Sequence, residues 1–565
     1  MRRSVLFFSM FVLFTVFVKG ETVTTKFSEI LSEEAGRNFK ALQKQEIPPY
    51  YISYRVEDER SVTLSAELGA VSSRDEERNR ILTVMVRVGS PERDNFHPLR
   101  EDVSVYYTSQ GEEARLPYED DPEAVSRVVR LATEKAYRKA LMRFSKVRAN
   151  LEVKVAEEDS SPDYTMPSPS VSTTSDHTEA PRPFLSSWEE PLKEWSALFL
   201  RDPRCFSGTA EIRLVDTEKT FVDTQGAAIV QYSSRARLSF EAMTKADDGM
   251  VIPVFLSFEG KSADDFPSRE IIFREVEKRA ALMEALRNAP LVEPYSGPAI
   301  LSGEAAGVFF HEIFGHRLEG QRMKEVTDSQ TFKDKIGAQV LPRSFSVTFD
   351  PARTRFEGKF LWGGYAFDDE GVPAQRVDVV EKGILKDFLM SRTPLEGHPS
   401  SNGHGRAQAG RLPVARQSNM FVSVEDPLTK EALRRRLIRE LTEQGKPFGY
   451  RIEAVQGGFT LTKRFSPNAF NVNPFIVYRV YTDGRPDELV RGVDLIGTPL
   501  SMFSHIEAGG GEYGVFSGFC GAESGAVPVA AVAPELFVSQ VELQKKGISQ
   551  NRPPLLERPD RREEP

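Results

Sequence analysis

The sequence has no excess of positive charge. Among its 565 residues, 74 Lys and Arg stand against 83 Asp and Glu, which gives a net charge of −9. Phosphate groups repel an acidic protein, so neither nucleic acid nor an anionic membrane surface is expected to be its main partner. The composition, 40% hydrophobic and 28% charged, is that of an ordinary globular protein, and the length allows about three or four domains.

Long apolar runs are equally scarce. The one near the start, residues 5–18, follows Arg2 and Arg3 and precedes small residues suited to cleavage before Glu21. It is shorter than the roughly 20 residues that span a membrane, and the whole pattern is typical of a secretory signal. We therefore predict that residues 1–20 are a signal peptide, that the protein is exported to the periplasm or the medium, and that no membrane span remains after cleavage. An uncleaved anchor is the alternative. Without this segment the net charge is −12, because three basic residues and no acidic one are lost.

Cysteine is the third scarcity, since only Cys205 and Cys520 occur. No cysteine follows the apolar run, which argues against lipid attachment there. In an exported chain, two cysteines often form one disulfide. Cys520 is also a candidate metal ligand, and the two roles exclude each other. We predict that both thiols are free in the metal-bound protein.

The remaining chain predicts an α+β fold, in which an N-terminal antiparallel sheet with long helices precedes a C-terminal β-rich barrel or sandwich. Residues 21–155 are expected to be an N-terminal α/β domain, because alternating β-rich runs follow a first helix and Asp121-Pro122 can start a long second one. Residues 156–182 are rich in Ser, Thr and Pro and are expected to be an exposed linker or loop. Residues 183–295 then supply strands and a helix that complete the N-terminal domain.

Residues 296–565 are expected to hold a helix followed by the C-terminal β-rich domain. Many short strand candidates at close intervals need a barrel or a sandwich to cover their edges. The glycine-rich stretches 509–511 and 518–525 are expected to be loops, and Cys520 lies in the second of them.

Two of the seven histidines lie in the helix expected at the start of this domain, where residues 307–316 read GVFFHEIFGH. His311, Glu312 and His316 are polar groups in an apolar surround, which is costly unless something compensates them. A zinc ion would do so, because imidazole nitrogens are common zinc ligands. A carboxylate beside the metal can also take a proton from water.

The spacing of the two histidines leaves this interpretation open. They lie five residues apart, about 140° on a regular helix, so a straight helix would not aim both at one ion. The commoner zinc-protease motif places them four apart. Ser302 can cap the helix at its start, and Gly315 can end it in a left-handed conformation that swings His316 back; a π-bulge would serve as well. The alternative is two histidines near a helix end, one satisfied by a backbone carbonyl.

A catalytic zinc usually has three protein ligands and one open position. The candidates for the third ligand are Cys520, His404, His505, His398 and Glu319. Cys520 lies among small residues, where backbone can approach a metal closely, and a thiolate is a strong zinc ligand. The residues alone do not decide among these candidates.

Several motifs in the right order give the chain a specific resemblance. Residues 298–320, which end HEIFGHRLEG, resemble the signature of the TldD/PmbA family of metallopeptidases. Residues 368–376, DDEGVPAQR, resemble a family segment that leads into a β-hairpin, and residues 401–406, SNGHGR, resemble the glycine-rich turn that follows. Residues 518–521, GFCG, with a VPV run shortly after them, resemble the family's cysteine loop.

The resemblance runs from about residue 205 to the C-terminus, and more faintly through residues 21–150. It implies a zinc site whose ligands are His311, His316 and Cys520. It also implies that Glu312 is the general base and that the substrates are unfolded or short peptides. The active form would be a dimer, either of identical chains or with a motif-lacking PmbA-like chain. Because this chain has the motif, it resembles the TldD half.

These observations together predict an exported zinc-dependent peptidase. Glu312 would accept a proton from a water activated by zinc and pass it to the leaving amine. A peptide bound as an added strand at a sheet edge would be read by its backbone, which predicts broad specificity. Two alternatives remain: a non-catalytic secreted β-rich binding protein, and an inactive zinc-binding partner subunit.

Overall fold

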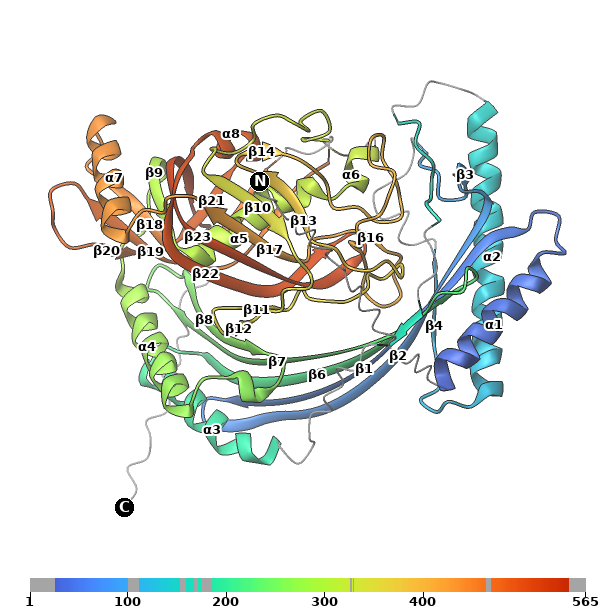
Figure 1. Cartoon of the computed structure of the whole chain (residues 1–565). Helices are drawn as coiled ribbons and strands as arrows, with labels where there is room; N and C mark the ends of the chain where they lie inside the picture. The colour runs from blue at the N-terminus through green and yellow to red at the C-terminus, as the bar shows by residue number, and fades with distance from the viewer. Residues whose placement is uncertain are drawn as a thin grey trace, which may run out of the picture.

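The computed structural model describes residues 26–99, 111–152, 159–166, 171–173, 185–325, 328, 330–463 and 469–547. The predicted signal peptide lies outside the described residues, as does most of the predicted linker. Two large sheets organise the rest: an N-terminal one of eight strands and a C-terminal one of eleven. Figure 1 shows the long N-terminal strands curving beneath the C-terminal domain. In the described part of the chain, no helix is long and apolar enough to cross a membrane.

The N-terminal sheet is made mainly of long antiparallel strands. In chain order they are β1 (Pro49–Glu67), β2 (Ala70–Ser90), β3 (Arg93–Asp94), β4 (Glu112–Arg115), β5 (Val171–Thr173), β6 (Ser207–Asp223), β7 (Ala228–Lys245) and β8 (Val251–Gly260). β1 pairs with β2 on one side and with β6 on the other, and β7 and β8 follow β6. Strands from before and after the predicted linker therefore share one sheet.

Helices cover one face of this sheet. They are α1 (Lys26–Leu42), α2 (Pro122–Glu152), α3 (Ser186–Ala197) and α4 (Arg269–Asn288), with 3-10 turns η3 (Leu198–Arg201) and η4 (Ala263–Asp265). α1 and α2 share an apolar core with β1 and β2, and α3 and α4 share another with β6, β7 and β8. Asp121 starts α2 as predicted, since its Oδ1 accepts from the Ala124 N–H at 2.8 Å. The opposite face of the sheet turns toward the C-terminal domain (Figure 1).

Part of the predicted linker is buried. The ring of Tyr164 lies between two guanidinium groups, that of Arg87 at 3.6 Å and that of Arg392 at 4.2 Å from the ring centroid. Asp163 beside it is buried too and contacts His97 at 2.8 Å. The expectation of an exposed stretch is therefore wrong for Asp163 and Tyr164, because cation–π contacts and an ion pair hold them between the two domains, whereas residues 160, 162 and 166 are exposed as predicted.

The C-terminal sheet contains a closed ring of five strands. They are β9 (Tyr295–Leu301), β18 (Phe448–Thr460), β19 (Phe470–Tyr481), β21 (Val493–Gly497) and β23 (Gly525–Lys545). The ring closes because β23 pairs with both β21 and β9. Each of the five strands is therefore paired on both sides over part of its length, and the predicted α+β class with a β-rich C-terminal domain is confirmed.

Shorter elements extend this ring. Joined to it are β10 (Phe345–Phe349), β13 (Val377–Glu381), β14 (Ile384–Leu385), β17 (Asn419–Val424), β20 (Glu488–Val490) and β22 (Ile506–Ala522). Two small hairpins are β11 (Arg355–Phe356) with β12 (Lys359–Phe360) and β15 (Gly405–Arg406) with β16 (Val414–Ala415). The helices are α5 (Gly303–Ile313), α6 (Gln321–Lys324), α7 (Lys430–Glu443) and α8 (Pro499–Ser504).

Helix α5 is the centre of the C-terminal core. It contacts β18, β19, β22 and β23, and its apolar side chains belong to the largest buried cluster of the described residues. Ser302 caps its start as predicted, because the Ala305 N–H donates to Ser302 Oγ at 3.3 Å. The helix that carries the motif is thus fixed on several sides by packed strands.

The glycine-rich stretches around Cys520 are mainly strand, not loop. β22 runs through residues 509–511 and on to Ala522, so the loop prediction is wrong for the first stretch and for residues 518–522, while residues 523–524 form the turn between β22 and β23. The glycines have a packing role instead: a Cβ added to Gly514 would lie 2.1 Å from the Glu304 backbone nitrogen, and one added to Gly303 would lie 2.1 Å from that of Gly514. β22 therefore approaches α5 backbone to backbone, which no larger residue would allow.

Candidate metal centre

The end of α5 explains how two histidines five residues apart can converge. The α-helix ends at Ile313, and a 3-10 turn, Gly315–Leu318, follows it directly. Neither a left-handed Gly315 nor a π-bulge occurs, so those two suggestions are wrong. Gly315 is required for space, because a Cβ there would lie 1.9 Å from Gln417 Oε1. The tighter turn brings His316 back toward the face of the helix that carries His311.

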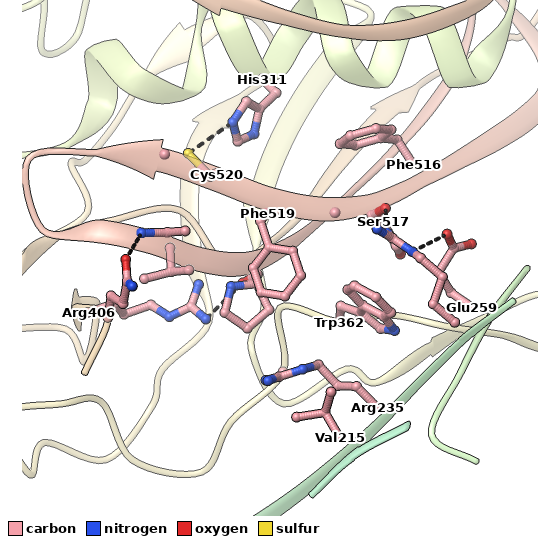
Figure 2. Close-up of a pocket in the computed structure, with 18 of the residues that line it drawn as sticks. Val215, Arg235, Glu259, His311, Trp362, Arg406, Phe516, Ser517, Phe519 and Cys520 are labelled. Atoms are coloured by element: carbon pink, nitrogen blue, oxygen red, sulfur yellow. Dashed lines mark hydrogen bonds and ion pairs between the residues drawn. The ribbon is translucent and has the colours of Figure 1, made fainter. Parts of the chain in front are cut away.

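His311, His316 and Cys520 meet at one point; we call them the His/Cys cluster. The Cys520 sulfur lies 3.2 Å from His311 Nε2 and 3.3 Å from His316 Nε2. The two imidazole rings are 5.0 Å apart and nearly perpendicular, at 80°. Figure 2 shows His311 pointing from α5 toward Cys520 on β22. All three side chains are buried.

The donor set and spacing of this cluster fit a zinc ion. Zinc prefers imidazole nitrogen and thiolate sulfur in a tetrahedral arrangement, which places neighbouring ligand atoms roughly 3.3 to 3.7 Å apart. The separations of 3.2 and 3.3 Å are close to that range, and all three ligand atoms lie within 4.8 Å of one another. The structure thus brings together the three residues that the sequence resemblance proposed as ligands.

The charges around the cluster favour the thiolate form of Cys520. Burial raises the pKa of the Cys520 thiol, but His316, His311 and Arg416 outweigh it and hold that pKa well below its ordinary value. Burial lowers the pKa of His316, yet Cys520 and Glu319 carry it well above its ordinary value. The thiolate is the form of cysteine that binds metals, whereas His316 must release its proton to become a ligand.

Glu319 orients His316. Its carboxylate accepts from His316 Nδ1 at 3.1 Å, which leaves Nε2 free to face the cluster. Arg322 Nε donates to the same carboxylate at 2.8 Å, and Arg416 Nε lies 3.4 Å from it. Glu319 was considered from the sequence only as a ligand; its place three residues after His316 could have indicated this supporting role. No sequence pattern indicated Arg416, whose Nη2 also donates to the Cys520 carbonyl oxygen at 2.5 Å.

Glu312 lies beside the cluster and is nearly buried, with 7% of its surface exposed. Burial raises its pKa above the ordinary value, against the opposing effect of the two histidines. Strand β18 fits against it closely, since a Cβ on Gly458 would lie 2.9 Å from Glu312 Cγ. Arg317 holds the helix end in place by donating to the Glu312 carbonyl oxygen at 2.8 Å.

The remaining sequence candidates lie elsewhere. His404 is buried and hydrogen-bonded to Asn402 and Ser418, and burial lowers its pKa to about 3, so it is neutral. His505 contacts Ser539, and His398 contacts Asp387. None of these three described histidines lines the cavity at the His/Cys cluster. Both cysteines are free, as predicted, because Cys205 belongs to the N-terminal core.

A cavity of about 2750 Å³ connects the cluster to the N-terminal sheet. Its lining includes His311, Glu312, His316 and Cys520 on one side. The opposite wall is formed by β1, β6, β7 and β8, from which polar and charged side chains point inward. Typical small-molecule sites are about 300 to 1,000 Å³, so this one has room for an extended polymer.

Comparisons with known proteins agree with the motifs. Residues 294–545 match the family model described as the PmbA/TldA metallopeptidase C-terminal domain. A metalloprotease of Archaeoglobus fulgidus is 26% identical over 354 residues, which cover 60% of this chain and 78% of that protein. A zinc metalloprotease TldD homologue of Saccharolobus solfataricus is 24% identical over 330 residues, covering 58% and 68%.

A solved structure shows the same fold. The crystal structure of TldE from Thermococcus kodakarensis superposes with a TM-score of 0.59 at 14% identity, over 92% of this chain and 100% of that one. The fold therefore extends over both domains, beyond the segment that the family model matches. The family match of residues 294–545, the related sequences and the shared fold together support a protein of the TldD/PmbA family of metallopeptidases.

Proposed function

We propose that this protein is an exported zinc-dependent peptidase that cleaves unfolded or short peptides. The observation that carries the proposal is the His/Cys cluster beside the buried Glu312, at the wall of a cavity large enough for a peptide. The names of the related proteins, metalloproteases in two organisms, support a metal-dependent hydrolase.

His311, His316 and Cys520 would hold the zinc ion. When bound, zinc would lower the pKa of a water and polarise the carbonyl group of the substrate. Glu312 would act as the general base, accepting a proton from the attacking water and passing it to the departing amine. Its raised pKa suits that role, because a base works best when its pKa lies near the operating pH.

The edge of β18 would align the peptide. β9 covers this strand only at residues 450–452, whereas residues 454–460 line the cavity next to Glu312. A peptide added along this edge would be held by backbone hydrogen bonds, which favours broad specificity. We further propose a dimer, with an identical chain or a motif-lacking PmbA-like one, which size-exclusion chromatography of co-expressed chains would test.

Zinc content and peptide hydrolysis, measured side by side for the wild type and Glu312→Gln, test the proposal. We expect one zinc in each, and a loss of about 10²- to 10⁴-fold in kcat for the variant, because general base catalysis contributes that much. Glu304→Gln is the matched control: this carboxylate also lies on α5 and lines the cavity, but at the other end of the helix. It should retain activity.

The other outcomes are equally informative. Zinc in both proteins with activity in neither, even after addition of a PmbA-like partner, would favour an inactive zinc-binding subunit. Absence of zinc from the wild type would contradict the assignment of the ligands. Export is tested separately by fractionation of cells that express the full chain, where retention of the whole protein in the cytoplasm would contradict it.

A further inference from the structure

Phe519 is a large apolar side chain that stands half exposed inside the cavity. It directly precedes the ligand Cys520 on β22, so the two Cα atoms are about 3.8 Å apart. Neighbouring side chains on a strand point to opposite faces; Cys520 faces the histidines, whereas Phe519 points toward the N-terminal sheet (Figure 2). Its ring is 51% exposed, although burying such a side chain is ordinarily favourable by about 1.5 to 3 kcal/mol.

Other rings and cations hold the surroundings of Phe519 in place. Trp362 meets it edge to face, with ring centroids 5.5 Å apart, and the Arg235 guanidinium lies 5.7 Å from the centroid of the Phe519 ring. Arg237 stacks on Trp362 at 4.2 Å and is itself fixed, because it donates to the Ser517 carbonyl oxygen at 3.0 Å and pairs with Glu259 at 3.3 Å. We call Phe519, Trp362 and Arg235 the aromatic shelf.

Single exposed apolar residues are common and usually need no explanation. Phe459 is such a case, since it is 54% exposed and lines the same cavity, but within the described residues it has no ring or cation contact of the kind that surrounds Phe519. The aromatic shelf differs because it is built from both domains and lies one residue from the His/Cys cluster. A peptide bound at the His/Cys cluster would bring its side chains past the aromatic shelf.

We propose that the aromatic shelf is a specificity subsite that binds an aromatic side chain of the peptide, next to the bond that is cleaved. An aromatic ring would pack against Phe519, and Arg235 would attract its π face, as guanidinium groups do. Aliphatic side chains would gain only the apolar contact, and short uncharged polar ones such as serine neither. The proposal rests on the peptidase function and adds a local preference to backbone-directed binding.

Binding of fluorescein-labelled peptides to the zinc-loaded Glu312→Gln protein tests this subsite without turnover. The peptides are alanine-rich, equal in length and different in a single central residue, which is Phe, Leu or Ser. We expect the Phe peptide to bind about tenfold more tightly than the Ser peptide, with Leu between them, as an aromatic contact of ordinary strength predicts. Adding Phe519→Ala should reduce the difference to less than about twofold.

Two further variants keep this test decisive. Phe519→Leu retains apolar surface without a ring, so it should lose the preference for Phe over Leu but keep that for Leu over Ser. Leu461→Ala is the control, since this exposed apolar side chain lines the same cavity beyond the end of β18, and it should leave all affinity ratios unchanged. Unchanged zinc content in each variant shows that the site is intact. Equal binding of the three peptides, or a preference that survives Phe519→Ala, would overturn the subsite alone. No binding of any peptide would overturn the peptidase proposal with it.

Discussion

Two groups of potential metal ligands lie close to Arg322, and they differ in the protein side chains that already neutralise their charges. In the described residues, the His/Cys cluster is one, and Glu325, Asp328 and Glu523, the acidic cluster, are the other. Arg322 donates to Glu523 at 2.7 and 3.0 Å and to Asp328 at 3.3 Å. Lys463 pairs with Glu325 at 2.7 Å and Asp328 at 3.1 Å.

The acidic cluster therefore already holds two cations, Arg322 and Lys463, whereas the Cys520 sulfur contacts two imidazole nitrogens and has Arg416 as the cation beside it. Ligand atoms that converge on one point are not enough to make a metal site, because Lys and Arg side chains can neutralise the same carboxylates. Arg322 lies between the groups: it also contacts Glu319, which orients His316. The two clusters are thus parts of one charge network with different functions.

Among the variants that test this difference between the two clusters, Cys520→Ala should have the largest effect. Loss of the thiolate removes a ligand, so zinc affinity should fall by more than about 100-fold, beyond the loss expected from a supporting residue. Zinc content after dialysis against a weak chelator measures it. Cys205→Ala is the matched control, since this buried thiol lies in the N-terminal core, and its zinc content should equal that of the wild type. Equal zinc in both variants would contradict the ligand assignment.

Arg322→Met should convert the acidic cluster into a cation site. With the guanidinium removed, three carboxylates lose their partner, and we expect the free energy of unfolding to fall by about 3 to 5 kcal/mol. Calcium ions, which prefer carboxylate oxygens, should then raise the Tm of the variant but not of the wild type. Urea unfolding and thermal scans with and without calcium measure both effects.

Arg434→Met serves as the control for that change. Arg434 also forms a two-bonded pair with a carboxylate, Asp487, but it is 39% exposed. Its loss should cost less than about 1 kcal/mol. A calcium response in the wild type would show that the acidic cluster is a metal site after all.

Glu319→Gln should weaken zinc binding more modestly, by about 10- to 100-fold, because it alters the hydrogen bond that orients His316 without removing a ligand. Competition with a chromogenic chelator gives the affinity. Asp387→Asn is the control, since Asp387 makes a similar contact to His398 at 2.9 Å outside the cavity. An unchanged zinc affinity for Glu319→Gln would mean that His316 is held by its backbone alone.

Glu325→Gln should leave zinc binding unchanged and affect only stability. Burial raises the pKa of Glu325 to about 7, so the folded protein binds the proton more tightly than the unfolded chain. That contribution is present at low pH and is lost as the pH rises toward 7. Relative to the variant, the wild type should lose up to about 2 kcal/mol between pH 5 and pH 7. Urea unfolding at both pH values measures the difference. An equal change in the free energy of unfolding of the two proteins between these pH values would contradict the prediction.

Local signals in the sequence predicted the elements that carry the site. Ser302 and the apolar run after it defined the start of α5, and Asp121-Pro122 defined the start of α2, because caps and helical periodicity are short-range features. The polar residues 57–60 interrupt the apolar alternation of the sequence, yet β1 continues through them. Glu57 and Glu59 face the cavity, so polarity marked its lining and not a turn.

Long-range packing set the features that the sequence did not reveal. The glycines near Cys520 suggested a loop. Their packing role was not visible in the sequence, because the close approach of α5 to β22 joins residues about 200 positions apart. No sequence pattern indicated the roles of Arg416 and Arg322 either, because Cys520 and Glu523, to which they donate, lie far from them in the chain. The ligand set itself followed only from family resemblance, as five candidates for the third ligand were open on chemistry alone.

The packing of α5 against β22 also determines when the His/Cys cluster can form during synthesis of the chain. His311 and Cys520 are 209 residues apart in the chain, and β22 lies near its C-terminal end. A chain that is still leaving the ribosome, or one cut short before β22, contains Glu312 and both histidines but lacks the sulfur. The His/Cys cluster therefore cannot form in such a partial chain, and its assembly has to follow synthesis of residue 520.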